Sequence, residues 1–179
     1  SKLSTLLENG VARGFFSADQ AAPALSRIQP TLEIADLGDV GMVTEAVLES
    51  IEVKKEVLTA LDRSCKRECL IATNTSTIPI STLAAVLSGE RQERFIGTHY
   101  FSPVSRMKLV EVIPAFVTSQ STVEKTVQLV TGAGKTPIRV KDVAGFAGNR
   151  MLLMFRIEAI KLVEEGVATP EDLDTACRL

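Results

Sequence analysis

The sequence has almost no net charge, no long apolar run and no recognisable leader. Its 20 Lys and Arg residues nearly balance 22 Asp and Glu residues, and a net charge of −2 favours neither nucleic acid nor an acidic membrane surface. The longest apolar runs, such as residues 151–155, fall far short of the ~20 residues that a membrane span requires. The N-terminus lacks the basic and apolar regions of a signal peptide. We therefore expect a cytoplasmic protein with no nucleic-acid partner and no membrane span.

Cysteine and histidine are too scarce for a disulfide framework or a structural zinc site. Three cysteines leave one thiol unpaired in any pairing scheme, and the single histidine is not accompanied by a CxxC pair. We therefore expect no bound metal. Any imidazole chemistry must pass through His99.

Apolar patterning along the 179 residues predicts an α/β fold. Short apolar segments typical of strands alternate with segments of helical spacing, and this alternation favours a mostly parallel sheet. Ser121 and Glu124 match a capping box at the start of one helix. We expect strands at residues 31–34, 42–47, 69–72, 94–98, 107–113 and 136–140, and helices at 3–13, at 17–28, from 50, at 79–87 and from 121.

The pattern changes to helix alone from Gly145 onward. Apolar residues recur at helical spacing from Leu152 to Leu162, and Thr169-Pro170 is typical of the start of another helix. We predict a domain boundary near Asp142. Residues 1–142 would form an incomplete Rossmann-type domain, a doubly wound parallel sheet without its glycine-rich first βα unit, and residues 143–179 would begin an all-helical domain.

No segment supplies a glycine-rich loop for phosphate. Residues 132–136 read GAGKT, but a helix ends there and a strand begins, which is the reverse of the order in a P-loop. We interpret these glycines as a helix stop. The GxGxxG fingerprint of dinucleotide-binding sheets is also missing from the sequence.

One histidine and one glutamate are candidates for chemistry. His99 follows an apolar strand at the sheet edge where ligands bind in open α/β folds, although a sole histidine is also often structural. Glu111 interrupts a strand that is apolar on both faces, so its buried carboxylate needs a partner. That partner is a backbone amide, Lys108, Arg106 or His99. Pairing with His99 would give a base that is oriented by a carboxylate.

Two further polar residues lie at predicted boundaries, one after a strand and one before a helix. The hydroxyl of Ser76 lies just past a strand end, where it could hold a substrate oxygen or cap the helix near Pro79. Asn149 precedes the long helix, where an N-cap role would suit it equally well. Only their occurrence together with His99 and Glu111 favours a functional role.

Five ordered motifs resemble the L-3-hydroxyacyl-CoA dehydrogenase family, which includes the 3-hydroxybutyryl-CoA dehydrogenases. They run through nearly the whole chain, and together they are far more specific than any one of them. They are EAVLE at 45–49, NTST at 74–77, HYFSPV at 99–104, MKLVEV at 107–112, and Gly145-Phe146 with Asn149-Arg150.

The resemblance implies NAD-dependent oxidation of (3S)-3-hydroxyacyl-CoA to 3-oxoacyl-CoA, in fatty-acid or butanoate metabolism. It implies that His99 is the general base, that Glu111 orients the imidazole, and that the complete protein is a homodimer acting on an acyl-CoA thioester. Ser102 stands where the family often has asparagine. The implied substrate-binding residues are Ser76 and Asn149, and the implied cofactor-binding residues are Glu49, Lys54, Ser76 and Ser102.

Two other functions fit the same residues. One is a non-catalytic remnant or binding module that keeps the interior of the fold. The other is a Rossmann dehydrogenase for a different small hydroxy acid. NAD and NADP are not distinguished, because the residue that discriminates between them follows a strand that the sequence does not contain.

Overall fold

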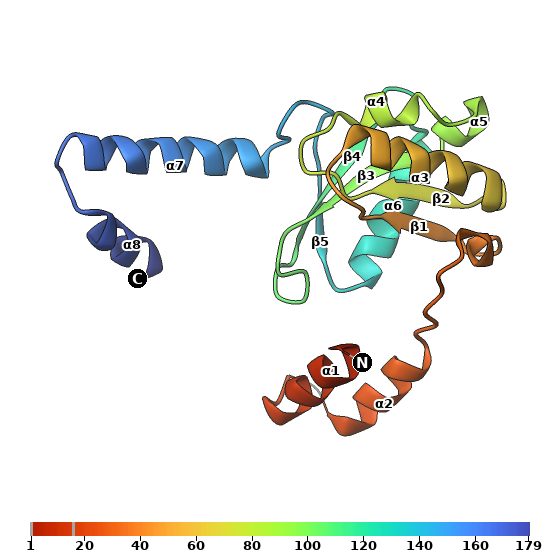
Figure 1. The fold of residues 1–179 in the computed structure, drawn as a ribbon, viewed down its shortest axis with the longest axis horizontal. Coiled ribbons are helices and arrows are strands. Elements are labelled where there is room, and N and C mark those ends of the chain that lie inside the picture. Colours follow the sequence, from red (N-terminus) through yellow and green to blue (C-terminus); the bar gives the residue numbers. More distant parts are fainter. Residues whose placement is uncertain (1, 16) are drawn as a thin grey trace. The chain divides into compact units, whose positions relative to one another are not determined.

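The computed structural model describes residues 2–15 and 17–179 (Figure 1). The chain divides into two compact units, one that ends at Asp36 and one that runs from Leu37 to Leu179. The candidate residues of the site all belong to the second unit. The domain boundary near Asp142 stays a prediction.

The first unit contains two helices, α1 (Lys2–Ala12) and α2 (Ala18–Ser26), as the sequence predicts. α1 ends before Gly14, whose φ of +71° is accessible to glycine without strain. Ser17 precedes α2 as its N-cap residue, and its N–H donates to the Gln20 Oε1 at 3.0 Å.

The strand expected at residues 31–34 is wrong. The segment bends at Leu32 and then forms the 3₁₀ helix η1 (Ile34–Leu37). The hydroxyl of Thr31 explains the difference, because it accepts from the Glu33 N–H at 3.0 Å and donates to the Asp36 carboxylate. These local bonds occupy groups that a sheet would otherwise use.

The second unit is built on a five-stranded sheet in the order β1-β2-β3-β4-β5. All neighbouring pairs are parallel except β3 and β4. Residues 101–108, which connect these two strands, are too few for the crossover of a dozen or more residues that a parallel pair requires. The strands are β1 (Met42–Glu45), β2 (Leu70–Thr73), β3 (Phe95–Tyr100), β4 (Leu109–Pro114) and β5 (Thr136–Arg139).

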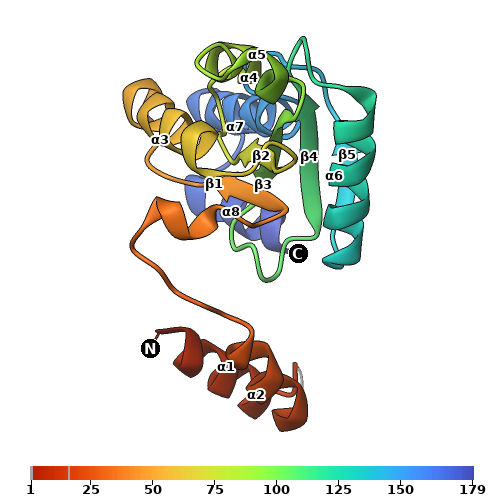
Figure 2. The same cartoon turned by 90° about the vertical axis from the view of Figure 1, so that its right-hand side faces the viewer.

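Helices cover both faces of this sheet, with α3 (Ile51–Ser64) on one side and α6 (Gln120–Gly132) on the other (Figure 2). On the face under α6, Ala72, Ile96 and Val112 of the sheet form a buried cluster with Val123 of the helix. The short helix α4 (Ile80–Ala84) packs on the opposite face over Gly97. A Cβ at Gly97 would lie 2.6 Å from the Ile80 Cδ1, so only glycine fits beneath α4. A fourth helix, α5 (Gly89–Gln92), was not predicted from the sequence.

The cap of α3 is as predicted, but the cap of α6 is not. Ser50 precedes α3, and its hydroxyl accepts from the Val53 N–H at 3.4 Å. At α6 the cap is Ser119, which accepts from the Thr122 N–H at 3.2 Å, so the expected capping box at Ser121 is wrong. The helix starts earlier because the Thr118 hydroxyl closes the preceding turn by accepting from the Ala115 N–H at 2.8 Å.

Two further helices follow the sheet, α7 (Gly148–Glu164) and α8 (Pro170–Arg178). Thr169 caps α8 as expected, accepting from the Asp172 N–H at 3.1 Å. Several apolar side chains of α7 are exposed, including Met151 and Phe155 at 67% and 57%. Within the described residues, no helix combines the length and the apolar character needed to cross a membrane.

Candidate active site

The antiparallel pairing of β3 and β4 places His99 directly opposite Glu111. The His99 Nδ1 and the Glu111 Oε2 are 2.7 Å apart, and both residues are buried. An ionised carboxylate has only acceptors, so Nδ1 donates in this bond and a neutral ring keeps Nε2 as an acceptor. The rings of Phe101 and Phe146 flank the imidazole, with centroids 4.7 and 5.7 Å away. The arrangement suits a base that takes a proton at Nε2.

The second carboxylate oxygen of Glu111 is held by the start of α7. Its Oε1 accepts from the Ala147 N–H at 2.9 Å and from the Gly148 N–H at 2.8 Å. Of the partners considered for Glu111, His99 and backbone amides therefore both apply. Lys108 and Arg106 are exposed and form no ion pair with it among the described residues.

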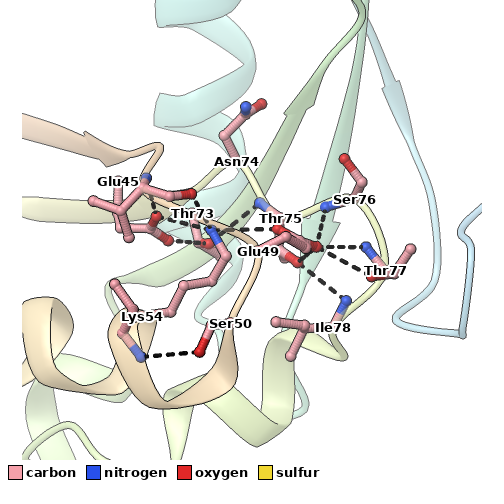
Figure 3. A network of polar contacts seen from close by, with 12 residues as sticks. Glu45, Glu49, Ser50, Lys54, Thr73, Asn74, Thr75, Ser76, Thr77 and Ile78 are labelled. Atoms are coloured by element: carbon pink, nitrogen blue, oxygen red, sulfur yellow. Dashed lines mark hydrogen bonds and ion pairs between the residues drawn. The ribbon is translucent and has the colours of Figure 1, made fainter.

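Ser76 lies in a loop that wraps around the carboxylate of Glu49 (Figure 3). The Glu49 Oε1 accepts from the Thr75 hydroxyl at 2.5 Å, the Ser76 N–H at 2.9 Å and the Thr77 N–H at 3.1 Å. Burial raises the pKa of Glu49, but these hydrogen bonds and the charge of Lys54 outweigh burial and lower the pKa to about 2. Glu49 is therefore an anion that fixes the backbone on both sides of Ser76.

Lys54 is enclosed beside Glu49, with only 1% of the residue exposed. Its Nζ lies 2.8 Å from the Glu45 Oε1 and 3.4 Å from the Glu49 Oε2, and it donates to the Val47 carbonyl at 3.3 Å (Figure 3). The ammonium thus donates to two protein acceptors and forms an ion pair with Glu49. Lys54 therefore stabilises the charge of Glu49.

Glu45 is a member of this network that sequence reasoning missed. Its Oε2 accepts from the Thr73 hydroxyl at 2.6 Å, and its Oε1 accepts from the Val47 N–H at 2.6 Å as well as from Lys54. The signal was present, because Glu45 ends an apolar strand in the same way that Glu111 interrupts one. A buried carboxylate in such a strand needs a partner.

Asn149 belongs to the first turn of α7 rather than to its cap, so the N-cap alternative is wrong. Its side-chain Nδ2 donates to the Ser76 carbonyl at 3.2 Å. The capping alternative for Ser76 is also wrong, because the carboxylate of Asp142 accepts from the Ile80 and Ser81 N–H groups at 2.8 Å each. Asp142 lies more than 60 residues away, so no local pattern could have predicted this role.

The structure brings six of the predicted residues into one assembly of hydrogen bonds and ion pairs, because Glu49 and Lys54 are connected to it through Ser76. His99 contacts Glu111, Glu111 contacts the first turn of α7, and Asn149 in that turn contacts Ser76. Ser102 lies apart from this chain of bonds, in the exposed loop after β3. Its role in cofactor binding stays a prediction.

Two family models match the chain from end to end. The model for the NAD binding domain of 3-hydroxyacyl-CoA dehydrogenase matches residues 1–143. The chain belongs to the 3-hydroxyacyl-CoA dehydrogenase family. The model for the C-terminal domain of the same family matches residues 145–179. The resemblance predicted from five motifs is therefore confirmed.

Individual members of the 3-hydroxyacyl-CoA dehydrogenase family agree with this assignment. The mitochondrial hydroxyacyl-coenzyme A dehydrogenase of Sus scrofa is 44% identical over 77% of this chain and 43% of its own length. The 3-hydroxybutyryl-CoA dehydrogenase of Clostridioides difficile is 37% identical over 94% of this chain and 59% of its own length. The chain thus spans about half the length of these relatives.

The fold is also shared with solved members of the 3-hydroxyacyl-CoA dehydrogenase family. The crystal structure of (S)-3-hydroxybutyryl-CoA dehydrogenase from Ralstonia eutropha superposes with a TM-score of 0.88. It is 37% identical and covers 94% of this chain and 59% of its own length. The predicted fold class, an incomplete Rossmann-type sheet followed by helices, is confirmed.

Proposed function

We propose that the complete protein oxidises the 3-hydroxyl group of a (3S)-3-hydroxyacyl-CoA thioester to a ketone, with NAD as cofactor. The observation that carries the proposal is the buried His99–Glu111 pair, with 2.7 Å between Nδ1 and Oε2. A carboxylate-oriented imidazole is suited to taking a hydroxyl proton. The names of the relatives from Sus scrofa and Clostridioides difficile agree with this substrate class.

The proposed division of labour follows from the contacts of each residue. NAD, when bound, supplies the acceptor for the hydride that leaves C3 of the substrate. His99 takes the hydroxyl proton at Nε2, and the electron pair of the broken O–H bond becomes part of the new carbonyl. Glu111 holds the ring at Nδ1 and stabilises the imidazolium that forms. We assign Ser76 and Asn149 to the substrate; their mutual hydrogen bond, and the contact of the same helical turn with Glu111, support this assignment.

The cofactor would lie at the carboxyl edge of the parallel strands, where α/β sheets bind ligands. The residues there fit a polar ligand, because Glu49 keeps a 38% exposed side chain and Ser76 is half-buried. We assign Glu49, Ser76 and Ser102 to direct cofactor contacts. Lys54 is too enclosed to reach a ligand, so its contribution to the cofactor site passes through Glu49.

The exposed apolar side chains of α7 support a homodimer of the complete protein. Met151 and Phe155 are more than half exposed, and a second subunit would remove them from water.

The experiment compares the complete protein with its His99→Gln, Glu111→Gln and double variants. The kcat for (S)-3-hydroxybutyryl-CoA, followed through NADH absorbance, should fall by roughly 10²–10⁴-fold in His99→Gln, with a smaller change in KM. The double variant should be little worse than the worse single variant, because both residues serve one proton transfer. The control is Lys125→Gln, which places the same side chain on the exposed surface of α6.

Four outcomes would contradict the proposal. Near-wild-type turnover in His99→Gln, or full additivity in the double variant, would leave the pair as structural residues. Equal turnover of free 3-hydroxybutyrate would indicate a dehydrogenase for a small hydroxy acid. Binding of NAD and the thioester without turnover would indicate a binding module.

A further inference from the structure

The first turn of α7 contacts both the His99–Glu111 pair and the loop that contains Ser76. The N–H groups of Ala147 and Gly148 donate to one oxygen of Glu111, at 2.9 and 2.8 Å. The next residue, Asn149, donates to the Ser76 carbonyl. A single helical turn therefore connects the acid of the pair to the loop assigned to the substrate.

A side chain at Gly148 would displace the ring of Phe101. A Cβ at this position would lie 2.6 Å from the Phe101 Cζ and 3.0 Å from its Cε1. Phe101 in turn packs on the ring of His99. Gly148 does not have a positive φ, so the effect of a side chain here comes from this contact and not from backbone strain.

The chain reaches this position through two consecutive residues in the left-handed region. Gly145 has a φ of +73° and Phe146 has a φ of +49°. Phe146 is 1% exposed, and a non-glycine residue holds such a conformation only where its surroundings fix it. The turn aims successive backbone N–H groups at a single oxygen, as in the backbone nests that bind anions.

We propose that Gly148 is a positioning residue of the reaction and acts through Glu111; this inference rests on the proposed function. Its N–H, with that of Ala147, fixes Oε1 and thereby keeps Oε2 in line with the His99 Nδ1. Without these two hydrogen bonds Oε1 is no longer fixed, so the carboxylate turns away from Nδ1 and the imidazole is less often oriented to take a proton.

The test is Gly148→Ala in the complete protein. The added methyl group separates the turn from the Phe101 ring, so kcat should fall by roughly 10–100-fold with a smaller change in KM. The matched control is Gly132→Ala at the end of α6, where a Cβ meets no atom within 4 Å and the φ is not positive. Both kcat and KM of Gly132→Ala should equal those of the wild type.

A second variant relieves the clash and covers a failure of Gly148→Ala to fold. Phe101→Leu removes the ring atoms that the new Cβ would meet, so Gly148→Ala should have little further effect in a Phe101→Leu background. The two substitutions should thus be strongly non-additive in kcat.

A measurement without turnover separates this inference from the proposed function. The amide proton of Gly148 should resonate at low field in an NMR spectrum, and it should move when Glu111→Gln removes the charge of its acceptor. If this resonance responds but no thioester is oxidised, only the proposed function fails. An unmoved resonance, an unchanged kcat in a folded Gly148→Ala, or equal effects of Gly148→Ala in the wild-type and Phe101→Leu backgrounds would overturn the inference.

Discussion

Replacing Lys54 by methionine should destabilise the second unit more than any surface substitution. The change keeps most of the side-chain volume but leaves Glu45 without its cation at 2.8 Å, in a place where the two side chains are 1% and 0% exposed. Removing one partner of a buried ion pair costs about 3–5 kcal/mol. Glu45 keeps its bonds from the Val47 N–H and the Thr73 hydroxyl, so we expect the lower end, about 3 kcal/mol.

A double-mutant cycle tests the origin of that loss. Glu45→Gln removes the charge but keeps an oxygen that can accept from Thr73 or Val47, so Lys54→Met with Glu45→Gln should cost much less than the sum of the single changes. The free energy of unfolding is measured in urea by far-UV circular dichroism, with the denaturant slope checked for each variant. A loss below about 1 kcal/mol in Lys54→Met, or additive single changes, would refute a strongly coupled buried pair.

Two further predictions concern acid stability and exposed apolar surface. The folded-state pKa of Glu49, about 2, lies below its ordinary 4.5, so its ionised form contributes stability that is complete above 4.5 and is lost as the pH falls towards 2. The stability advantage of wild type over Glu49→Gln should therefore shrink across that window, and a constant difference would contradict the assigned bonds. The 179-residue chain should also bind an environment-sensitive dye through exposed side chains of α7, and Leu153→Glu with Phe155→Glu should weaken that signal. Unchanged fluorescence would place the dye on another surface.

Sequence reasoning succeeded where a local pattern or a burial argument was enough. Alternation predicted all five strands of the sheet, and an acid in an apolar strand correctly indicated that Glu111 needs a buried partner. Reasoning failed where one side chain outweighed the pattern, as Thr31 does before η1 and Thr118 does before α6. Such side-chain hydrogen bonds are not visible in the pattern of apolar and polar residues.

Long-range contacts made the rest of the site unpredictable. The amides that hold Glu111 come from a turn 36 and 37 residues later in the chain, and Asn149 reaches back 73 residues to the Ser76 carbonyl. Every residue type except proline carries a backbone N–H donor, so the sequence does not show which amides will hold a carboxylate. Asn149 as a cap and Asn149 as a bridge to Ser76 present the same local sequence, and only the path of the chain after β5 decides between them.

β3 and β4 form the single antiparallel pair of the sheet, and their register decides whether His99 faces Glu111. Facing residues of β3 and β4 are fixed by the ladder, which sets His99 across from Glu111. A slip of one residue within either strand sets a valine, Val110 or Val112, across from the imidazole and turns the carboxylate to the other face. Insertions should therefore be tolerated better in residues 103–108, beyond the residues assigned to the site, than in the two strands beside them.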